Sequence, residues 1–284
     1  MRVRLGMLLV VSCCTVWPGC GAEKEDALLV HVGGTMRPVM QKLATDYETE
    51  TGQKIEINSA DSGELLAHIE GQKEGDVYVC HDPFLDILMK KYRMGVDGWV
   101  LAELTPVIVV KKGNPRNIKG LADLTRPDVE LWLTDYEHST LGRMLPTLFT
   151  KAGIDFEKLN RDKKINVHRS GGHVANMVVT GNADAAMCWL AVAALRRDDL
   201  DVVQITPAHL PTPGVDTVTS ATGKAYPLTP VRVTIATLTC ARRPEAAQKF
   251  AEFVASKKAA EVLKDFGFTL TNPRKAYDDG KPID

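Results

Sequence analysis

Short apolar runs and amphipathic segments alternate along the first third of the chain. LLVHVG (28–33), KIEINSA (54–60) and DVYVCH (76–81) are typical of strands, and the middle one alternates with a period of two. Between them, apolar residues recur every three or four positions, which predicts helices over 35–50 and 62–70. This strand–helix–strand–helix–strand order predicts a parallel sheet with helices on both faces.

The same pattern starts again after a helix over 83–94 and a long apolar strand over 104–115. The periodicity of the second unit predicts strands over 129–135, 165–169, 184–189 and 202–206, and helices over 139–152 and 172–180. A stretch rich in Pro, Thr and Gly (207–230) follows as a connecting loop. The chain then ends with a strand over 232–238 and helices over 244–256 and 258–266.

Two successive α/β units predict an α/β fold of two lobes joined by a hinge, with a ligand in the cleft between them. We expect residues 28–106 to begin lobe 1, residues 107–211 to form lobe 2, and residues 212–284 to return through the hinge and complete lobe 1. Ligands of open α/β sheets bind beyond the carboxyl ends of the strands. The loops that follow strands are therefore the places to search for chemistry.

The first twenty residues are a segment of a different kind. MRVRLGMLLVVSCCTVWPGC carries Arg2 and Arg4, then an apolar run too short to span a bilayer, and it ends in Gly19 and Cys20. This pattern predicts a signal peptide over residues 1–20 of the lipoprotein kind, cleaved before Cys20, which then carries lipid. Ordinary secretion with an accidental cysteine is the alternative. Either way, we expect the mature protein in the periplasm or on the outside face of the membrane.

Composition and charge narrow the class of protein further. The 284 residues are 44% hydrophobic and 25% charged, as in ordinary soluble domains. Removing Arg2 and Arg4 from 35 basic residues leaves 33 against 36 acidic ones, and with no basic stripe this argues against a nucleic-acid partner. Outside the signal segment and Cys20, Cys80, Cys188 and Cys240 form no C-x-x-C pair, so we expect no disulfide framework.

Hydroxyls and glycines gather where predicted strands give way to helices. The four junctions are Gly33 to Thr35, Ser59 to Gly63, Tyr136 to Thr140, and Ser170 to Val174. A helix N-terminus offers unpaired N–H groups and a partial positive charge, and Ser and Thr hydroxyls also donate. Several such ends can therefore hold an oxyanion without a cationic side chain. Each junction taken alone is more simply an ordinary helix cap.

A set of motifs runs through residues 28–270. They are VHVGGTMRPVMQKLATDYETETGQKIEINSADSGELLAHIE, DVYVCHDP, VIVVKKGNP with IKGLADL, VELWLTD, GNADAAMCW and RRPEAAQKFAEFVASKKAAEVLKDFGF. Together they resemble the periplasmic molybdate/tungstate-binding proteins of ABC importers. The resemblance implies the two-lobed type II periplasmic binding protein fold, each lobe a mixed, mainly parallel sheet flanked by helices. It also implies capture of a tetrahedral oxyanion and its delivery to a membrane permease, without catalysis.

The resemblance further implies which residues contact the anion. Hydroxyls would come from Thr35 and Ser62 in lobe 1. Backbone amides would come from Ser139 or Thr140 and from Val174 in lobe 2. The implied ligand-binding set is Gly34, Thr35, Ser62, Gly63, Ser139, Thr140, Val174 and Trp189.

Two residues depart from the pattern of the family. Trp189 stands where the family has a tyrosine hydroxyl, so it offers an indole N–H from a different position. Asp61 stands directly before Ser62, where a carboxylate would repel a dianion. Asp61 and Glu64 also fit a capping box, in which Asp61 would occupy the helix end itself. A third reading is a ligand that carries a hydrogen-bond donor, such as protonated phosphate.

Other chemistries remain as alternatives. His81, His138 and His173 lie in strand-end loops, where a metal site is conceivable, and His138 or His173 could instead donate to the anion. No nucleophile signature such as G-x-S-x-G occurs, so we expect no enzyme and no cofactor. The alternatives are the same fold binding phosphate, a carboxylate metabolite or a chelated metal, or a sensor ectodomain or secreted hydrolase. The expected partners are a small oxyanion, an ABC permease and a lipid anchor on a monomer.

Overall fold

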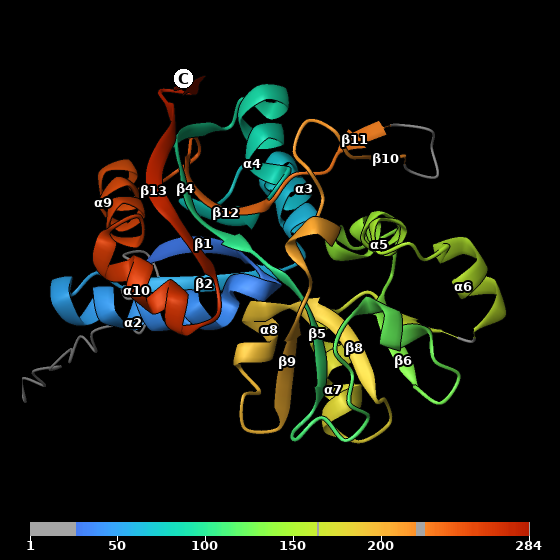
Figure 1. The fold of residues 1–284 in the computed structure, drawn as a ribbon. Coiled ribbons are helices and arrows are strands. Elements are labelled where there is room, and N and C mark those ends of the chain that lie inside the picture. The colour runs from blue at the N-terminus through green and yellow to red at the C-terminus, as the bar shows by residue number, and fades with distance from the viewer. Residues whose placement is uncertain (1–26, 164, 220–224, 284) are drawn as a thin grey trace, which may run out of the picture.

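The computed structural model describes residues 27–163, 165–219 and 225–283, so the predicted signal peptide and Cys20 lie outside the described residues. The chain forms two lobes, each a sheet with helices packed against it (Figure 1). Lobe 1 is the seven-stranded sheet with its helices, and lobe 2 is the five-stranded sheet with its helices. Within the described ranges, no helix is long and apolar enough to cross a membrane.

The sheet of lobe 1 has the strand order β14-β13-β4-β12-β3-β1-β2. Its strands are β1 (Leu28–Gly33), β2 (Ile55–Ala60), β3 (Val77–His81), β4 (Gly95–Leu104), β12 (Val231–Leu238), β13 (Thr269–Asp278) and β14 (Lys281–Pro282). β1 pairs in parallel with β2 and with β3, whereas β12, β4, β13 and β14 pair in antiparallel fashion. The carboxyl ends of the three parallel strands therefore lie at one edge of the sheet.

The helices of lobe 1 follow the predicted amphipathic segments. They are η1 (Gly34–Met36), α2 (Arg37–Thr51), α3 (Ser62–Gln72), α4 (Phe84–Asp86), the π-helix η2 (Ile87–Tyr92), α9 (Pro244–Val254) and α10 (Lys257–Asp265). In α2, Val39, Met40 and Leu43 share the face that is buried against the sheet. The helix ends where Gly52 adopts a φ of 74°, a left-handed conformation that glycine accepts without strain.

The sheet of lobe 2 has the strand order β7-β6-β8-β5-β9. Its strands are β5 (Pro106–Lys111), β6 (Leu131–Thr134), β7 (Asn166–His168), β8 (Ala185–Trp189) and β9 (Leu200–Gln204). Its helices are η3 (Leu121–Thr125), α5 (Thr140–Lys151), α6 (Phe156–Asp162), α7 (Gly171–Val179) and α8 (Leu190–Ala194). β6 pairs in parallel with β7 and β8, and β5 pairs in antiparallel fashion with β8 and β9.

The chain passes from lobe 1 to lobe 2 between Leu104 and Pro106, and it returns after β9. The return segment contains η4 (Pro207–His209), β10 (Thr217–Thr219) and β11 (Ala225–Pro227). Leu104 pairs with Val231 in lobe 1, and Pro106 pairs with Trp189 in lobe 2. Only Thr105 separates these two pairs, so the strand ends of the two sheets face each other across this linker.

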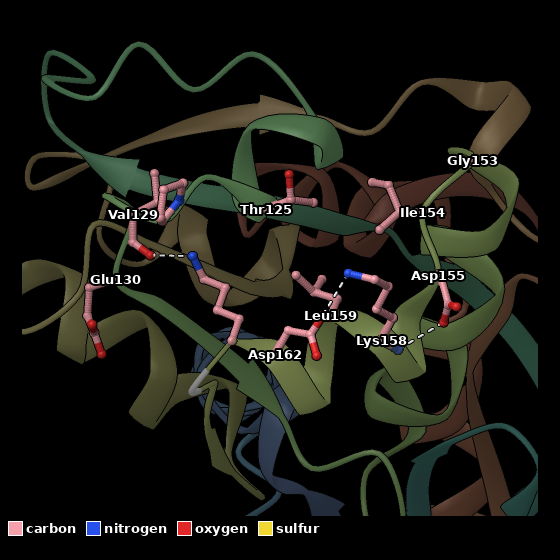
Figure 2. A pocket seen from close by; sticks show the side chains of 11 residues that line it. Thr125, Val129, Glu130, Gly153, Ile154, Asp155, Lys158, Leu159 and Asp162 are labelled. Carbon is pink, nitrogen blue, oxygen red and sulfur yellow. Dashed lines mark hydrogen bonds and ion pairs between the residues drawn. The ribbon is translucent and has the colours of Figure 1, made fainter.

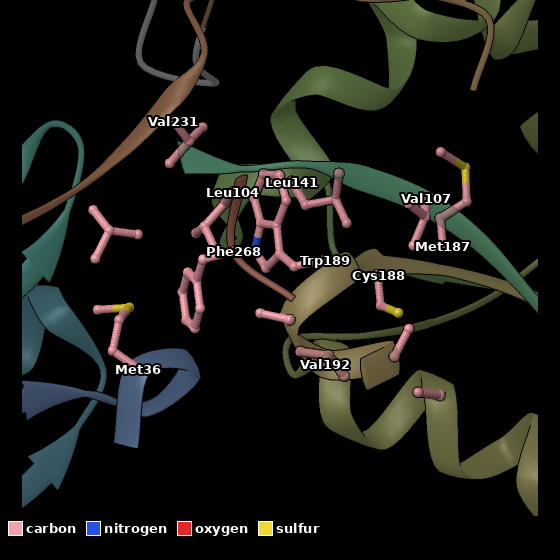
Figure 3. Close-up of a cluster of buried hydrophobic side chains, with 14 of the residues drawn as sticks. Met36, Leu104, Val107, Leu141, Met187, Cys188, Trp189, Val192, Val231 and Phe268 are labelled. Carbon is pink, nitrogen blue, oxygen red and sulfur yellow. The ribbon is translucent and has the colours of Figure 1, made fainter. Parts of the chain in front are cut away.

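A hydrophobic cluster joins the two lobes at the linker. Figure 3 shows Leu104 and Phe268 of lobe 1 together with Trp189 and Leu141 of lobe 2, all of them buried. Nearby, a Cβ added to Gly267 would lie 2.8 Å from the Cβ of Ala194, which shows how closely α8 approaches lobe 1. The lobes therefore share part of one apolar core.

The structure corrects several sequence predictions. Residues 95–104 form a separate strand, β4, where only a strand over 104–115 was predicted, and the predicted helix over 83–94 is a short α-turn followed by a π-helix. Elements that were not predicted are β13, β14, α6, α8 and the hairpin β10–β11. Both sheets are mixed, as expected. Parallel pairing is confined to two strand pairs in each sheet, which is less than the mainly parallel arrangement we predicted.

Candidate functional site

The loops after β1 and β2 meet at one point in lobe 1. Gly33 ends β1 beside Ala60 of β2, and a Cβ added to Gly33 would lie 2.4 Å from Ser62 Oγ. Only glycine allows the hydroxyl to approach the strand this closely. Ser62 is 4% exposed, and its Oγ is a buried atom without a hydrogen-bond partner among the described residues. Because an unpaired buried hydroxyl is costly, this atom is a candidate ligand contact.

The first turn of α3, which begins at Ser62, also carries N–H groups outside the helical hydrogen-bond ladder. The N–H of Leu65 bonds the carbonyl oxygen of Asp61 at 3.0 Å, so the helical ladder starts there. The three preceding N–H groups have no intrahelical acceptor, as at any helix start. The Asp61 side chain makes no capping hydrogen bond, so the predicted capping box is wrong and these N–H groups stay available.

A buried tyrosine positions the backbone of Ser62. The Tyr78 hydroxyl donates to the carbonyl oxygen of Ser62 at 2.5 Å. Burial strongly raises the pKa of Tyr78, so the phenol remains a donor throughout the physiological range. This hydrogen bond from β3 therefore fixes the position of the first residue of α3.

The loop after β3 lies at the same edge of the sheet as the loops after β1 and β2. His81 Nδ1 donates to the carbonyl oxygen of Asp82 at 2.7 Å, which leaves Nε2 as the free nitrogen of the ring. Burial lowers the pKa of His81, so the ring is neutral near pH 7. Arg232 holds the Asp82 carboxylate in a bidentate pair at 2.7 and 2.8 Å. Arg232 lies at the start of β12, so this pair ties the strand that re-enters lobe 1 to the loop after β3.

In lobe 2, a carboxylate organises the loop between β6 and α5. Asp135 Oδ1 accepts from the N–H groups of Glu137 and His138 and from His138 Nδ1, at 2.8 to 3.0 Å. Burial acts to raise the pKa of Asp135, but these donors outweigh it and hold the pKa below its usual value. His138 Nδ1 therefore serves to bond Asp135 within this loop.

The Ser residues at the two helix starts of lobe 2 are ordinary caps. Ser139 Oγ accepts from the N–H of Gly142 at 2.8 Å, and Ser170 Oγ accepts from the N–H of His173 at 3.3 Å. Neither hydroxyl donates a hydrogen bond to another of the described residues. The N–H of Val174 bonds the carbonyl oxygen of Ser170 at 3.2 Å, and the N–H of Ser139 bonds that of Asp135 at 3.0 Å, so these two expected amide contacts are already used within the protein. The first N–H groups of α5 and α7, which precede these bonds, have no acceptor within the part of the chain that the structure describes.

The predicted contacts fall into one group on each lobe. Gly34 and Thr35 begin the turn η1 directly after Gly33, the residue that lies against Ser62. In lobe 2, Thr140 begins α5, and the parallel neighbours β6 and β7 bring the starts of α5 and α7 together.

Trp189 lies where β8 reaches the linker. It is 7% exposed, it belongs to the interlobe apolar cluster, and its Nε1 makes no hydrogen bond to any described residue (Figure 3). Its ring therefore packs between the lobes while its N–H remains unused. The sequence pattern indicated the position of Trp189 but not this packing role.

A separate cavity of about 640 Å³ lies on the outer side of lobe 2, between α6 and the segment before β6 (Figure 2). Several of its polar side chains already have partners. Lys163 Nζ donates to the carbonyl oxygen of Val129 at 2.7 Å, and Lys158 pairs with Asp162 at 2.7 Å. Because none of the buried unpaired side-chain atoms of the described residues lines this cavity, it is a weaker candidate than the strand-end loops.

The histidines do not form a metal site. Among the described residues, no group of three or more His, Cys, Asp or Glu side chains is arranged to hold a metal ion. The alternative of a site built from His81, His138 and His173 is therefore wrong for the arrangement seen here. His173 instead stacks on His168, with ring centroids 3.9 Å apart.

Two mixed sheets with helix starts and hydroxyls facing each other across a linker define a two-lobed type II periplasmic binding protein. The family model for bacterial extracellular solute-binding proteins matches residues 28–269. The chain belongs to this family, whose members act outside the cytoplasm, bind small solutes and deliver them to ABC permeases.

Similar proteins agree with this class. A putative binding protein of Haemophilus influenzae is 24% identical over 85% of this chain and 90% of its own length. The molybdate-binding protein ModA of Mycobacterium tuberculosis is 22% identical over 62% of this chain and 66% of its own length. The substrate-binding domain of a putative molybdenum ABC transporter from Clostridium difficile superposes with a TM-score of 0.66 at 18% identity, covering 86% and 99% of the two chains. Other structures of this fold are of PEB3 with bound L-phospholactate and of the sulfate-binding protein SubI, so the fold by itself does not select the ligand.

Proposed function

We propose that this protein captures a tetrahedral oxyanion, molybdate or tungstate, between its lobes and delivers it to an ABC importer. The observation that carries the proposal is the buried, unpaired Oγ of Ser62 at the first turn of α3, pressed against Gly33. A hydroxyl that donates, surrounded by unpaired N–H groups at the positive end of a helix, suits a fully ionised oxyanion. The relatives whose names mention molybdate support this choice of ligand.

The proposed contacts come from both lobes. Lobe 1 would supply Gly34, Thr35, Ser62 and Gly63, and lobe 2 would supply the hydroxyl of Ser139, the amide of Thr140 and the indole N–H of Trp189. The amides of Ser139 and Val174 are not part of the proposed set, because they already bond carbonyl oxygens. At the start of α7, Gly171 and Gly172 join this set, because their N–H groups precede the first helical bond. Neutral donors suffice when closure of the lobes excludes water, because electrostatic interactions strengthen as the local dielectric falls.

The rest of the proposal concerns location and assembly. The protein works as a non-catalytic monomer, tethered to the membrane by a lipid on Cys20 after the signal peptide is cleaved before that residue. Bending of the hinge occurs at the Leu104–Pro106 linker and along the return segment. Metabolic labelling with a fatty-acid analogue tests the anchor, because a Cys20→Ala variant would lose the label.

The test of the ligand is isothermal titration of protein that a bacterial host has exported and processed. Molybdate, tungstate, sulfate and phosphate are titrated separately at pH 7.5. The proposal requires one-to-one, submicromolar binding of molybdate or tungstate and much weaker binding of sulfate and phosphate. Absence of binding by all four anions would refute the oxyanion assignment and leave the fold and family unchanged.

A further inference from the structure

Buried polar atoms without partners are rare in folded proteins, and each calls for an explanation. In the described ranges they are Ser62 Oγ, Trp132 Nε1, Thr134 Oγ1 and Thr271 Oγ1. Ser62 belongs to the site proposed above. Two of the others lie on the single strand β6 of lobe 2, two residues apart.

The position of Thr134 places its hydroxyl at the strand edge that faces lobe 1. Thr134 is the last residue of β6, is 2% exposed, and lies beside His168 of the parallel strand β7. Alternate residues of a strand share one face, so Thr134 points to the same side as Trp132. The Trp132 ring packs against the ring of His173 in the first turn of α7, with centroids 5.7 Å apart. The Thr134 hydroxyl therefore lies on the α7 side of the sheet.

The start of α7 comes very close to the sheet at this point. A Cβ added to Gly171 would lie 3.6 Å from the Cβ of Cys188, on β8. Trp132 pairs with Ala186 of β8, so extending the parallel register places Cys188 beside Thr134. The unpaired N–H groups of Gly171 and Gly172 and the unpaired hydroxyl of Thr134 thus gather at one helix start.

We infer that Thr134 Oγ1 is a direct ligand contact in lobe 2, matching Ser62 Oγ in lobe 1. The inference rests on the proposed function, because it assumes that an oxyanion occupies the space between the two lobes. Each lobe then contributes one buried hydroxyl beside the N–H groups of one helix start. Neither hydroxyl has a partner among the described residues, and each would gain a charged acceptor on binding.

The test is Thr134→Val, which keeps the shape of a β-branched side chain and removes the hydroxyl. In the ligand-free protein, removal of an unpaired buried group should leave the melting temperature unchanged or raise it. Affinity for sodium molybdate, measured by isothermal titration, should fall about ten- to a hundredfold, the usual effect of losing a hydrogen bond to a charged acceptor. Thr134→Ser, which retains the hydroxyl, should bind within a few-fold of wild type.

Thr271→Val is the matched control. Thr271 also has a buried, unpaired hydroxyl, but its strand β13 is separated from the strand ends of β1 and β3 by β4 and β12. This variant should gain or keep stability without losing affinity. If Thr134→Val lowers the melting temperature and leaves molybdate affinity unchanged, the hydroxyl serves a buried water and the inference is wrong. If wild-type protein binds molybdate and both valine variants weaken binding equally, the inference is also wrong. If wild type binds none of the four oxyanions, the proposed function itself fails.

Discussion

Ser62→Ala should change the stability of the protein and its affinity for molybdate in opposite directions. The Ser62 hydroxyl is buried and unpaired, so it is desolvated in the free protein without a compensating bond. Leaving such a group unpaired costs about 1–3 kcal/mol. Alanine removes the group and keeps the Cβ, at a place where Gly33 already lies directly against the side chain.

The magnitudes follow from these contacts. We expect the ligand-free variant to be more stable by about 1 kcal/mol, which raises the melting temperature by roughly 2–4 °C for a chain of this size. In the complex, the variant loses a hydrogen bond to a charged oxygen, worth about 1.5–3 kcal/mol. Affinity should therefore fall about ten- to a hundredfold. Stability and affinity change in opposite directions.

The assay is thermal unfolding of the ligand-free protein together with titration of molybdate. Ser256→Ala is the control, because Ser256 Oγ caps α10 by accepting from the N–H of Ala259 at 3.2 Å. Loss of that cap should cost about 1 kcal/mol and leave affinity unchanged. The reasoning would be refuted if Ser62→Ala behaved like Ser256→Ala, with lower stability and unaltered binding.

Three further predictions concern charge and pH. Burial lowers the pKa of His31, so as the pH falls the unfolded state binds a proton at this residue before the folded state does. The contribution of neutral His31 to the free energy of unfolding should therefore be full above about pH 6.5 and decrease toward about pH 5. His31→Gln should reduce this pH dependence in thermal melts at the two pH values. Arg232→Met removes the bidentate partner of Asp82 and should cost about 2 kcal/mol in urea unfolding, whereas an unchanged midpoint would mean that solvent already screens the pair. Asp61→Asn removes one negative charge beside the proposed site and should strengthen molybdate binding about fivefold. Weaker binding of phosphate by Asp61→Asn would instead show that the Asp61 carboxylate accepts a hydrogen bond from the protonated ligand.

Local pattern determined much of this molecule. The period of two in residues 54–60 and the helical spacing after Thr35 and Ser62 predicted β2, α2 and α3 close to their observed limits. The loops after these strands were identified from the same pattern, because parallel strands place their carboxyl ends at one edge. The signal segment over residues 1–20 also depends on local composition alone and stays a prediction.

Several strands were missed because nothing local distinguishes them. β4 (95–104) runs directly into β5 with one residue between, so apolarity alone could not show that this stretch contains two strands that belong to different sheets. β13 (269–278) is mostly half-buried or exposed, and its pairing with β4 stabilises it as a strand. Pairing between strands far apart in the sequence is a tertiary effect that overrides local propensity.

For the candidate site too, the sequence indicated some features and only the tertiary structure showed the others. The sequence could point to Ser62 as a donor at a helix start, but only the packing of Gly33 against it shows a hydroxyl with no partner. It could not show that Trp189 is packed in the interlobe cluster, or that Asp82 is held by Arg232 from 150 residues away. Residue type sets which bonds a side chain can make, and the tertiary structure decides which of those bonds are already made and which remain open for a ligand.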